Sequence, residues 1–301
     1  MRCSRWATCS FCISVKDSNL RLGIHVRTGG GYAAALAHAK NAGCTAIQIF
    51  STNPRTYRVG PIDHAGLQTF AAMREEAGIF PAIIHTSYLI NLASEDQKIV
   101  TGSLRLLKND LDVAAAGGIT YVNTHLGSYG KRSRSEGFAD ACRALEKSLE
   151  GIQPGVYLVM ENSAGAGQLC GGTLEELGRF IKSVDHPQLG VCLDTAHAWA
   201  AGYEINSQRG VDDFLYQAAQ EIGLDRIHMF HFNDTQVPLG GNRDRHWHIG
   251  DGNIGFEGFR ALAARPELDE KTAILETPGE DADDIRNMET LRLIFKGARS
   301  S

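Results

Sequence analysis

The chain has 301 residues, of which 43% are hydrophobic and 22% charged. It contains 8 prolines and carries a formal net charge of −5. No apolar run approaches the roughly 20 residues that a membrane-spanning helix needs, so the composition favours a soluble globular protein and excludes an integral membrane protein. The negative balance argues against binding to a polyanion unless bound cations supply positive charge; three divalent ions would bring the balance to about +1.

The beginning of the chain differs in character from the rest. We expect residues 1–20 to form an N-terminal extension and residues 21–301 to form one domain, because no linker or composition shift divides the remainder. Cys9 and Cys12 make a CxxC pair, but no second pair accompanies them, so a flexible tail is preferred to a zinc site. The other cysteines are scattered, and the start of the chain lacks a convincing cleavage site. These features predict a cytoplasmic protein without a disulfide framework.

From residue 22 onward, short apolar or β-branched runs alternate with segments of helical composition. The strands are expected at 22–26, 46–50, 82–86, 119–125, 156–162, 189–194, 227–232 and 272–277, and the helices at 32–41, 64–77, 95–116, 136–149, 174–183, 212–222, 256–264 and 283–296. Gly43, Gly78 and Gly117 follow helices, where a residue with a left-handed backbone is favoured. Unbroken alternation of eight βα units predicts an α/β fold, a single (β/α)8 TIM barrel.

Ionisable side chains stand at or beside the ends of most of the predicted strands. They are His25, His85, His125, Glu161, Asp194, His231 and Glu276. In a closed barrel these ends converge on one face, where barrel active sites are assembled. A single strand-end histidine is usually a hydrogen-bonded structural group, but carboxylates packed together repel one another unless cations neutralise them, and histidines supply the nitrogen ligands that favour zinc. The sequence therefore predicts a site for several metal ions at the C-terminal ends of the strands.

Two spacings add candidate ligands. His197 follows Asp194 by three residues, and Asp244 and His246 form an Asp-x-His pair in the loop after the seventh strand. His248 continues the alternation of that pair and is a weaker candidate. The long loops at about 198–210 and 235–255 are where specialised function is expected.

At these residues the sequence resembles the endonuclease IV family of AP endonucleases, from about Leu22 to the end of the last strand. The motifs that carry the resemblance, in family order, are GIHVRTGGGYAAAL, HTSYLINLAS, THLGS, ENSAGAG, DTAHAWAAGY, HFNDTQVPLGGNRDRH, IGDGNIG and LETPG.

The resemblance implies three bound zinc ions, with manganese an alternative at one position. The implied ligands are His85, His125 and Glu161 for the first ion, Glu161, Asp194, His231 and Glu276 for the second, and His197, Asp244 and His246 for the third. His25 is not a ligand in the family pattern, and we interpret it as a residue that supports either the ligands or the fold.

The resemblance also implies the reaction: hydrolysis of the phosphodiester bond 5′ to an abasic site in double-stranded DNA, leaving a 3′-hydroxyl and a 5′-deoxyribose phosphate. Glu161 is then the catalytic residue that orients the attacking water, whose pKa the metal ions lower. Arg55 in STNPRTY and Tyr88 in HTSY match the residues that enter the duplex at the lesion. The family resemblance suggests a monomer, and no membrane contact is expected.

Some positions depart from the family pattern, and a short basic cluster has two alternative roles. Leu126 replaces a usual proline, Ala196 a common cysteine and Thr52 a frequent lysine, which puts the strength of the activity in doubt. The short basic cluster at 131–134, formed by Lys131, Arg132 and Arg134, suits phosphate contact and solubility equally.

Two other functions fit parts of the sequence. A metal-dependent sugar isomerase or epimerase shares the barrel and the strand-end ligands, but it leaves His197, Asp244 and His246 unexplained. A non-catalytic damage-binding or metal-storage barrel would be expected to have lost some ligands. Metal content separates these hypotheses, because about three zinc ions per chain support the nuclease and one or two manganese or magnesium ions support the isomerase.

Overall fold

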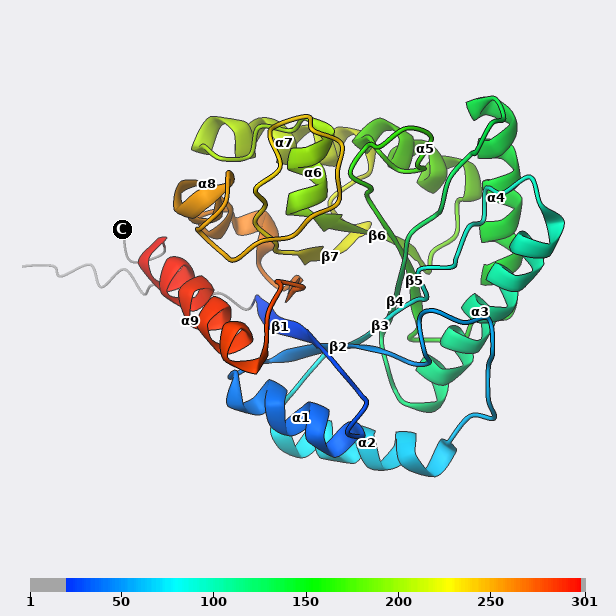
Figure 1. Ribbon diagram of the computed structural model, residues 1–301, viewed down its shortest axis with the longest axis horizontal. Coiled ribbons are helices and arrows are strands. Elements are labelled where there is room, and N and C mark those ends of the chain that lie inside the picture. Colours follow the sequence, from blue (N-terminus) through cyan, green and yellow to red (C-terminus); the bar gives the residue numbers. More distant parts are fainter. Residues whose placement is uncertain (1–19, 299–301) are drawn as a thin grey trace, which may run out of the picture.

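The computed structural model describes residues 20–298, so the predicted extension with Cys9 and Cys12 lies outside the described residues, apart from Leu20. Its strands form one closed parallel barrel in the order of the chain (Figure 1). The strands are β1 (Arg21–Val26), β2 (Ala46–Phe50), β3 (Ala82–His85), β4 (Tyr121–Thr124), β5 (Tyr157–Glu161), β6 (Leu189–Asp194), β7 (Ile227–His231) and β8 (Thr272–Leu275). The predicted (β/α)8 TIM barrel is confirmed.

Helices surround the strands in Figure 1 and cover the outside of the barrel. They are α1 (Tyr32–Asn41), α2 (His64–Ala77), α3 (Gln97–Ala116), α4 (Arg134–Leu149), α5 (Leu174–Val184), α6 (Thr195–Ala201), α7 (Gln208–Glu221), α8 (Gly255–Ala263) and α9 (Asp281–Ala298), with a 3-10 turn at Pro266–Leu268. Side-chain caps begin several of them: Asp63, Ser133 and Thr173 each accept a hydrogen bond from the backbone N–H three residues later. No helix within residues 20–298 is long and apolar enough to cross a membrane.

Two local expectations were wrong. The segment after β6 begins with the short helix α6, although a loop was expected from residue 198. Asp194 caps this helix by accepting the His197 N–H at 2.8 Å, so one residue serves both the strand end and the helix start. Gly117 does not adopt the left-handed region, since its φ is −98°, and the adjacent Gly118 takes that conformation with φ 57°.

A small apolar cluster made only of strand residues fills the middle of the barrel. Its buried members are Ala46, Ile83, Val159, Cys192, Met229 and Ile274. A Cβ atom at Gly23 would lie 2.3 Å from the Ala46 carbonyl oxygen, so β1 can approach β2 this closely only with glycine at that position. The larger core lies between the strands and the helices and includes Phe70, Phe180 and Phe259.

Candidate metal centre

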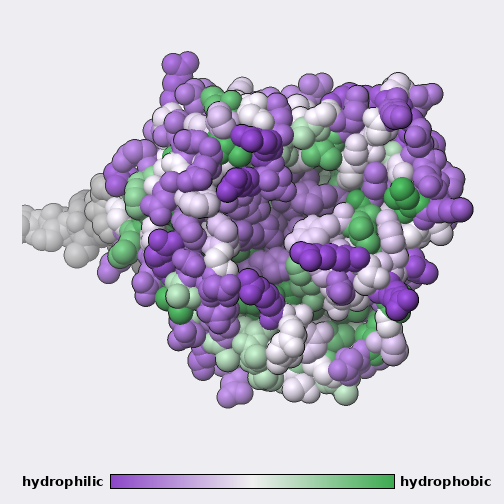
Figure 2. Space-filling model, viewed as in Figure 1, coloured by the Kyte–Doolittle hydropathy of each residue, from purple (hydrophilic) through white to green (hydrophobic). Residues whose placement is uncertain are grey.

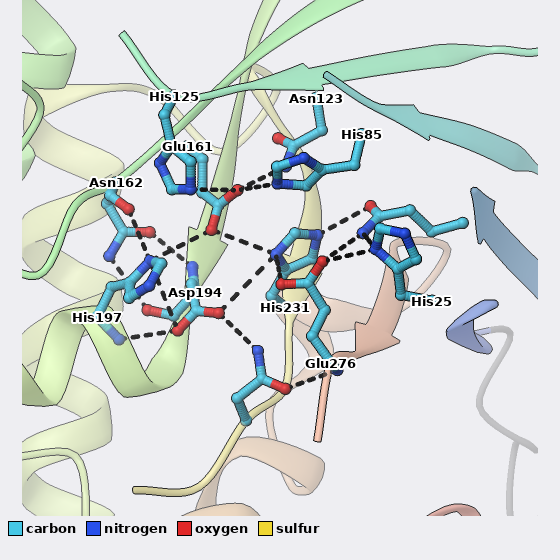
Figure 3. A network of polar contacts seen from close by, with 12 residues as sticks. His25, His85, Asn123, His125, Glu161, Asn162, Asp194, His197, His231 and Glu276 are labelled. Atoms are coloured by element: carbon cyan, nitrogen blue, oxygen red, sulfur yellow. Dashed lines mark hydrogen bonds and ion pairs between the residues drawn. The ribbon is translucent and has the colours of Figure 1, made fainter. Parts of the chain in front are cut away.

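The two-residue period of the strands builds the site directly above the apolar cluster, because side chains two positions apart point to the same face of a strand. Each cluster member is followed two positions later by a polar residue. The pairs are Ala46 and Gln48, Ile83 and His85, Val159 and Glu161, Cys192 and Asp194, Met229 and His231, and Ile274 and Glu276. These six polar side chains form a ring at the C-terminal end of the barrel, and Figure 3 shows five of them converging.

The first group of candidate ligands centres on Glu161, whose side chain is completely buried. Its Oε2 atom lies 3.4 Å from His85 Nε2 and 3.6 Å from His125 Nε2. β3 and β5 position His85 and Glu161, while His125 comes directly after β4. The strand register therefore brings all three side chains together (Figure 3).

The second group uses the other oxygen of Glu161. His231 Nδ1 lies 3.3 Å from Glu161 Oε1, 3.3 Å from Glu276 Oε2 and 3.8 Å from Asp194 Oδ2. Asp194 and His231 are register partners on β6 and β7. One carboxylate thus belongs to two ligand groups through two different atoms.

The third group combines α6 with the loop after β7. Asp244 Oδ1 lies 3.1 Å from His197 Nε2 and 3.5 Å from His246 Nε2, and the two histidine nitrogens are 3.4 Å apart. Asp194 Oδ2 also lies 3.5 Å from His246 Nε2. The Asp244 side chain is 60% exposed, in contrast to the buried carboxylates of the other groups.

The spacing of these nitrogen and oxygen atoms suits binding of divalent metal ions better than direct contacts between the atoms themselves. Ligands held at 2.0–2.1 Å in a tetrahedron are separated by about 3.3 Å, close to most of the separations just given. Glu161 Oε1 and His231 Nδ1 are buried and have no hydrogen-bond partner among the described residues. Buried polar atoms without partners are costly, so a cation placed between them would remove an otherwise unexplained penalty.

Each of four histidines uses its second ring nitrogen to fix the ring. His85 Nδ1 donates to Thr86 O at 2.8 Å, His197 Nδ1 to Asn162 O at 3.0 Å, His246 Nδ1 to Glu276 O at 3.1 Å and His231 Nε2 to Gln48 Oε1 at 3.0 Å. These bonds direct the remaining nitrogen of each ring at the cluster, as in the metal-binding histidines of known proteins.

Side-chain amides hold the carboxylates in a similar way. Asn123 donates to Glu161 Oε2 at 2.6 Å, Asn233 to Asp194 Oδ2 at 2.7 Å and Gln48 to Glu276 Oε1 at 2.6 Å. The sequence interpretation missed these amides. The signal was present in Gln48, because a polar residue interrupts the apolar run AIQIF on the inward face, two positions after Ala46.

The electrostatics of the ring follow from burial and mutual pairing. Burial opposes ionisation of Glu161, but His125 and His231 hold its pKa well below the ordinary range. Burial likewise disfavours the charged form of His231, yet the neighbouring Cys192, Glu276 and Glu161 raise its pKa well above the usual value. The ring is therefore dense in opposite charges that stabilise one another.

His25 and His248 lie beside the ligand groups rather than in them. His25 Nδ1 is 3.0 Å from Glu276 Oε1, which matches the interpretation of His25 as a supporting residue. His248 Nδ1 faces the Asn287 side chain at 3.1 Å, and His248 belongs to none of the candidate ligand groups among residues 20–298.

A pocket of about 630 Å³ opens onto the ring and corresponds to the hydrophilic hollow near the centre of Figure 2. Tyr88, His85 and Asp244 are among its lining residues. The Tyr88 side chain is 63% exposed, and its ring contacts Phe50 edge-on with 5.4 Å between the centroids. Arg55 is exposed on the loop after β2, and its backbone N–H is held by Asn53 Oδ1 at 3.0 Å.

Two residues of the basic cluster and one of the family departures have structural explanations. Arg132 pairs with Asp140 and donates to Ala93 O, and Arg134 donates to Gly167 O at 3.1 Å. Both arginines thus fasten parts of the chain together. Leu126 is buried and its carbonyl oxygen accepts the Leu92 N–H at 3.0 Å, so the His125 loop is fastened without proline.

A further group of candidate ligands, His38, Asp281 and Asp284, joins α1 to the start of α9. His38 Nε2 lies 2.9 Å from Asp284 Oδ2, and the Asp281 side chain is 82% exposed. We interpret these contacts as hydrogen bonding that joins the two helices.

Comparison with known proteins gives the class first. Residues 36–294 match the xylose isomerase-like TIM barrel family. Several solved structures share the fold at low identity, among them a D-tagatose 3-epimerase-like protein with a TM-score of 0.73, 18% identity and coverage of 93% of this chain and 99% of that one.

The similarity is higher to proteins that carry the name endonuclease 4. The chain is 42% identical to a probable endonuclease 4 of Natranaerobius thermophilus, covering 91% of this chain and 98% of the relative, and 40% identical to one of Solibacter usitatus, covering 91% and 96%. The crystal structure of endonuclease IV from Thermus thermophilus matches with a TM-score of 0.82 at 35% identity, over 92% of this chain and 99% of that one. The chain therefore belongs to the endonuclease IV family.

Proposed function

We propose that this protein is a DNA-repair endonuclease that hydrolyses the phosphodiester bond 5′ to an abasic site, leaving a 3′-hydroxyl and a 5′-deoxyribose phosphate. The observation that carries the proposal is the third ligand group, in which His197, Asp244 and His246 approach one another within 3.5 Å beside the two groups joined by Glu161. A phosphodiester has several oxygens to contact, and three cations can serve them together. The similarity to relatives named endonuclease 4 supports the same conclusion.

The proposal assigns the nine candidate ligands to three divalent ions, zinc in the first instance, with manganese an alternative at one position. Five histidines among the nine donors favour zinc over magnesium or calcium. Bound ions of this kind lower the pKa of water and neutralise charge on phosphate oxygens. We assign activity to residues 21–301, acting as a monomeric barrel domain.

Glu161 is the proposed catalytic residue, because it belongs to both of the first two ligand groups. Asn123 holds its Oε2 atom, and its Oε1 atom is left without a hydrogen-bond partner among the described residues. A fixed carboxylate in this position accepts a hydrogen bond from the attacking water and orients it toward phosphorus.

Arg55 and Tyr88 are the proposed DNA-binding residues. Both are exposed, and Tyr88 lines the pocket that leads to the metal centre. An abasic nucleotide has no base to unstack, so it enters such a pocket at lower cost than an intact nucleotide. A ring and a guanidinium suited to stacking can fill the space that the missing base leaves in the duplex.

An end-labelled duplex with one tetrahydrofuran abasic analogue tests the proposal, since this analogue cannot undergo β-elimination. We expect incision 5′ to the analogue, with a 3′ end that a polymerase extends, by the wild-type protein and not by Glu161→Gln. An undamaged duplex should stay intact. Absence of incision by folded, zinc-replete wild-type protein would reject the nuclease and direct attention to sugar substrates.

A further inference from the structure

Asp234 is a buried carboxylate that lies three residues beyond the candidate ligand His231 and was not singled out by the sequence. It accepts five backbone hydrogen bonds. The donors are Thr235 N at 2.8 Å and Ile254 N at 3.0 Å on Oδ1, and Gly250 N at 3.0 Å, Gly252 N at 3.1 Å and Gly255 N at 3.1 Å on Oδ2. One side chain thus fastens both ends of the loop that carries Asp244 and His246.

Asp234 and Thr235 also form hydrogen bonds with the residues on either side of His246. The Asp234 carbonyl oxygen accepts the Trp247 N–H at 2.6 Å, and Thr235 Oγ1 donates to Arg245 O at 2.7 Å. His246 itself donates to Glu276 O at 3.1 Å. Its ring is therefore placed by contacts to both neighbouring residues as well as by its own hydrogen bond.

The backbone around the carboxylate is shaped to converge on it. Gly250 and Gly255 have φ values of 86° and 64°, and a Cβ atom at Gly252 would lie 2.3 Å from Asp234 Oδ1. Backbone N–H groups that converge from these separate positions form a concavity that favours an anion. Asparagine at position 234 would direct an amide N–H group at these donors, so the concavity distinguishes the carboxylate from its nearly isosteric amide.

We propose that Asp234 is the positioning residue for the third ligand group, and that its loss weakens metal binding there while the two positions that share Glu161 stay filled. This inference rests on the proposed function in taking His197, Asp244 and His246 as a metal position. Asp234 acts through the loop, because Asp244 and His246 lie on it, whereas the other ligands lie on α6 or at strand ends.

The positions that share Glu161 have their own support. Asn233, although adjacent to Asp234, is held independently: its N–H donates to Thr195 Oγ1 at 2.9 Å, and Thr195 Oγ1 donates to Asn233 O at 2.7 Å. Asn233 therefore continues to support Asp194 when the carboxylate of Asp234 is removed.

The test measures the metal content of the full-length protein after zinc loading and dialysis against a weak chelator, without DNA. We expect Asp234→Asn to retain about one ion fewer per chain than wild type, as Asp244→Ala does, because loss of a supporting contact weakens metal affinity about 10–100-fold. Glu176→Gln is the matched control: Glu176 is also a buried carboxylate, and it accepts the N–H groups of Gly171 at 2.7 Å and Gly172 at 3.3 Å in a loop without candidate ligands. This control should keep the wild-type metal content.

Retention of the full metal content by Asp234→Asn, or equal loss from all positions, overturns the inference. If Asp234→Asn fails to fold, Gly252→Ala takes its place, since a Cβ atom there would lie 2.3 Å from Asp234 Oδ1 and displace the carboxylate from its donors; normal metal content in that variant then counts against the inference. Wild-type protein that binds three ions and does not incise abasic DNA would reject the proposed function alone. Fewer than three ions in the wild type would reject the inference itself.

Discussion

The middle and the C-terminal end of the barrel interior are built from the same strands. The middle is lined by apolar side chains and the C-terminal end by ionisable ones. The middle layer is apolar, with Ile83 and Val159 completely buried. Two residues further on, the same inward face presents His85 and Glu161. The apolar layer stabilises the barrel, which allows the layer above it to concentrate charges that are arranged for binding and chemistry.

Removing the shared carboxylate should give the largest effect. Glu161→Gln keeps the shape of the side chain but removes the charge that His85, His125 and His231 face. We expect kcat on abasic duplex to fall about a thousandfold, because a positioned acid or base contributes on that scale. Thermal unfolding should show a folded barrel, whereas retention of more than a tenth of the activity would show that the shared carboxylate is dispensable.

A cavity in the middle layer should lower the stability of the protein and leave kcat almost unchanged. Ile83→Ala removes a completely buried side chain directly below His85, and we expect a loss of about 3 kcal/mol in the free energy of unfolding. Urea denaturation measures that loss, and kcat at a temperature where the variant is folded should stay within a few fold of wild type. A large drop in kcat there would show that the two layers are not separable.

The amides that hold the carboxylates lie between these extremes. Gln48→Leu removes the bonds to Glu276 Oε1 and His231 Nε2 and preserves most of the volume. We expect zinc affinity to fall about 10–100-fold, measured by competition with a chromophoric chelator. Unchanged affinity would restrict Gln48 to a packing role.

We expect the smallest effect at a buried carboxylate outside the ring. It tests whether a buried carboxylate that belongs to no candidate metal site resists ionisation. Asp110 on α3 accepts a hydrogen bond from Ser51, and burial raises its pKa to about 7. Because the folded-state pKa lies above the unfolded value of about 3.9, ionisation penalises the folded state, and stability is lost as pH rises from about 4 through 7.

Asp110→Asn stays neutral, so between pH 5 and pH 8 the wild type should lose about 2 kcal/mol of unfolding free energy relative to the variant. Parallel denaturation curves at the two pH values measure the difference. An equal pH response in both proteins would place the pKa of Asp110 in its ordinary range.

The sequence predicted the architecture because the signals are local. Each strand is a short apolar run, and the polar residue that ends it, such as Asp194 or Glu276, interrupts a pattern visible within a few positions. The structure brings together all nine predicted ligands. The helix α6 was missed because Asp194 is both a strand end and a helix cap, so no separate start signal exists.

The contacts that hold the ligands could not be predicted in the same way. Three of the five donors to Asp234 lie on glycines, and four of the five donors are 16 to 21 residues away in the sequence. Backbone N–H groups carry no residue-specific signal, so only the folded loop shows that they converge. The choice of Gly118 over Gly117 for the left-handed conformation is similar, since both are glycine and the chain geometry decides between them.

The sharing of Glu161 has a thermodynamic consequence. One oxygen faces His85 and His125 and the other faces His197 and His231, so this one carboxylate would serve two ions in the proposed assignment. On the proposed assignment the same carboxylate would hold both ions, which would couple the two binding equilibria, so that occupancy of one position favours occupancy of the other. We therefore expect cooperative loading of the two proposed positions, and a chelator should remove both ions together.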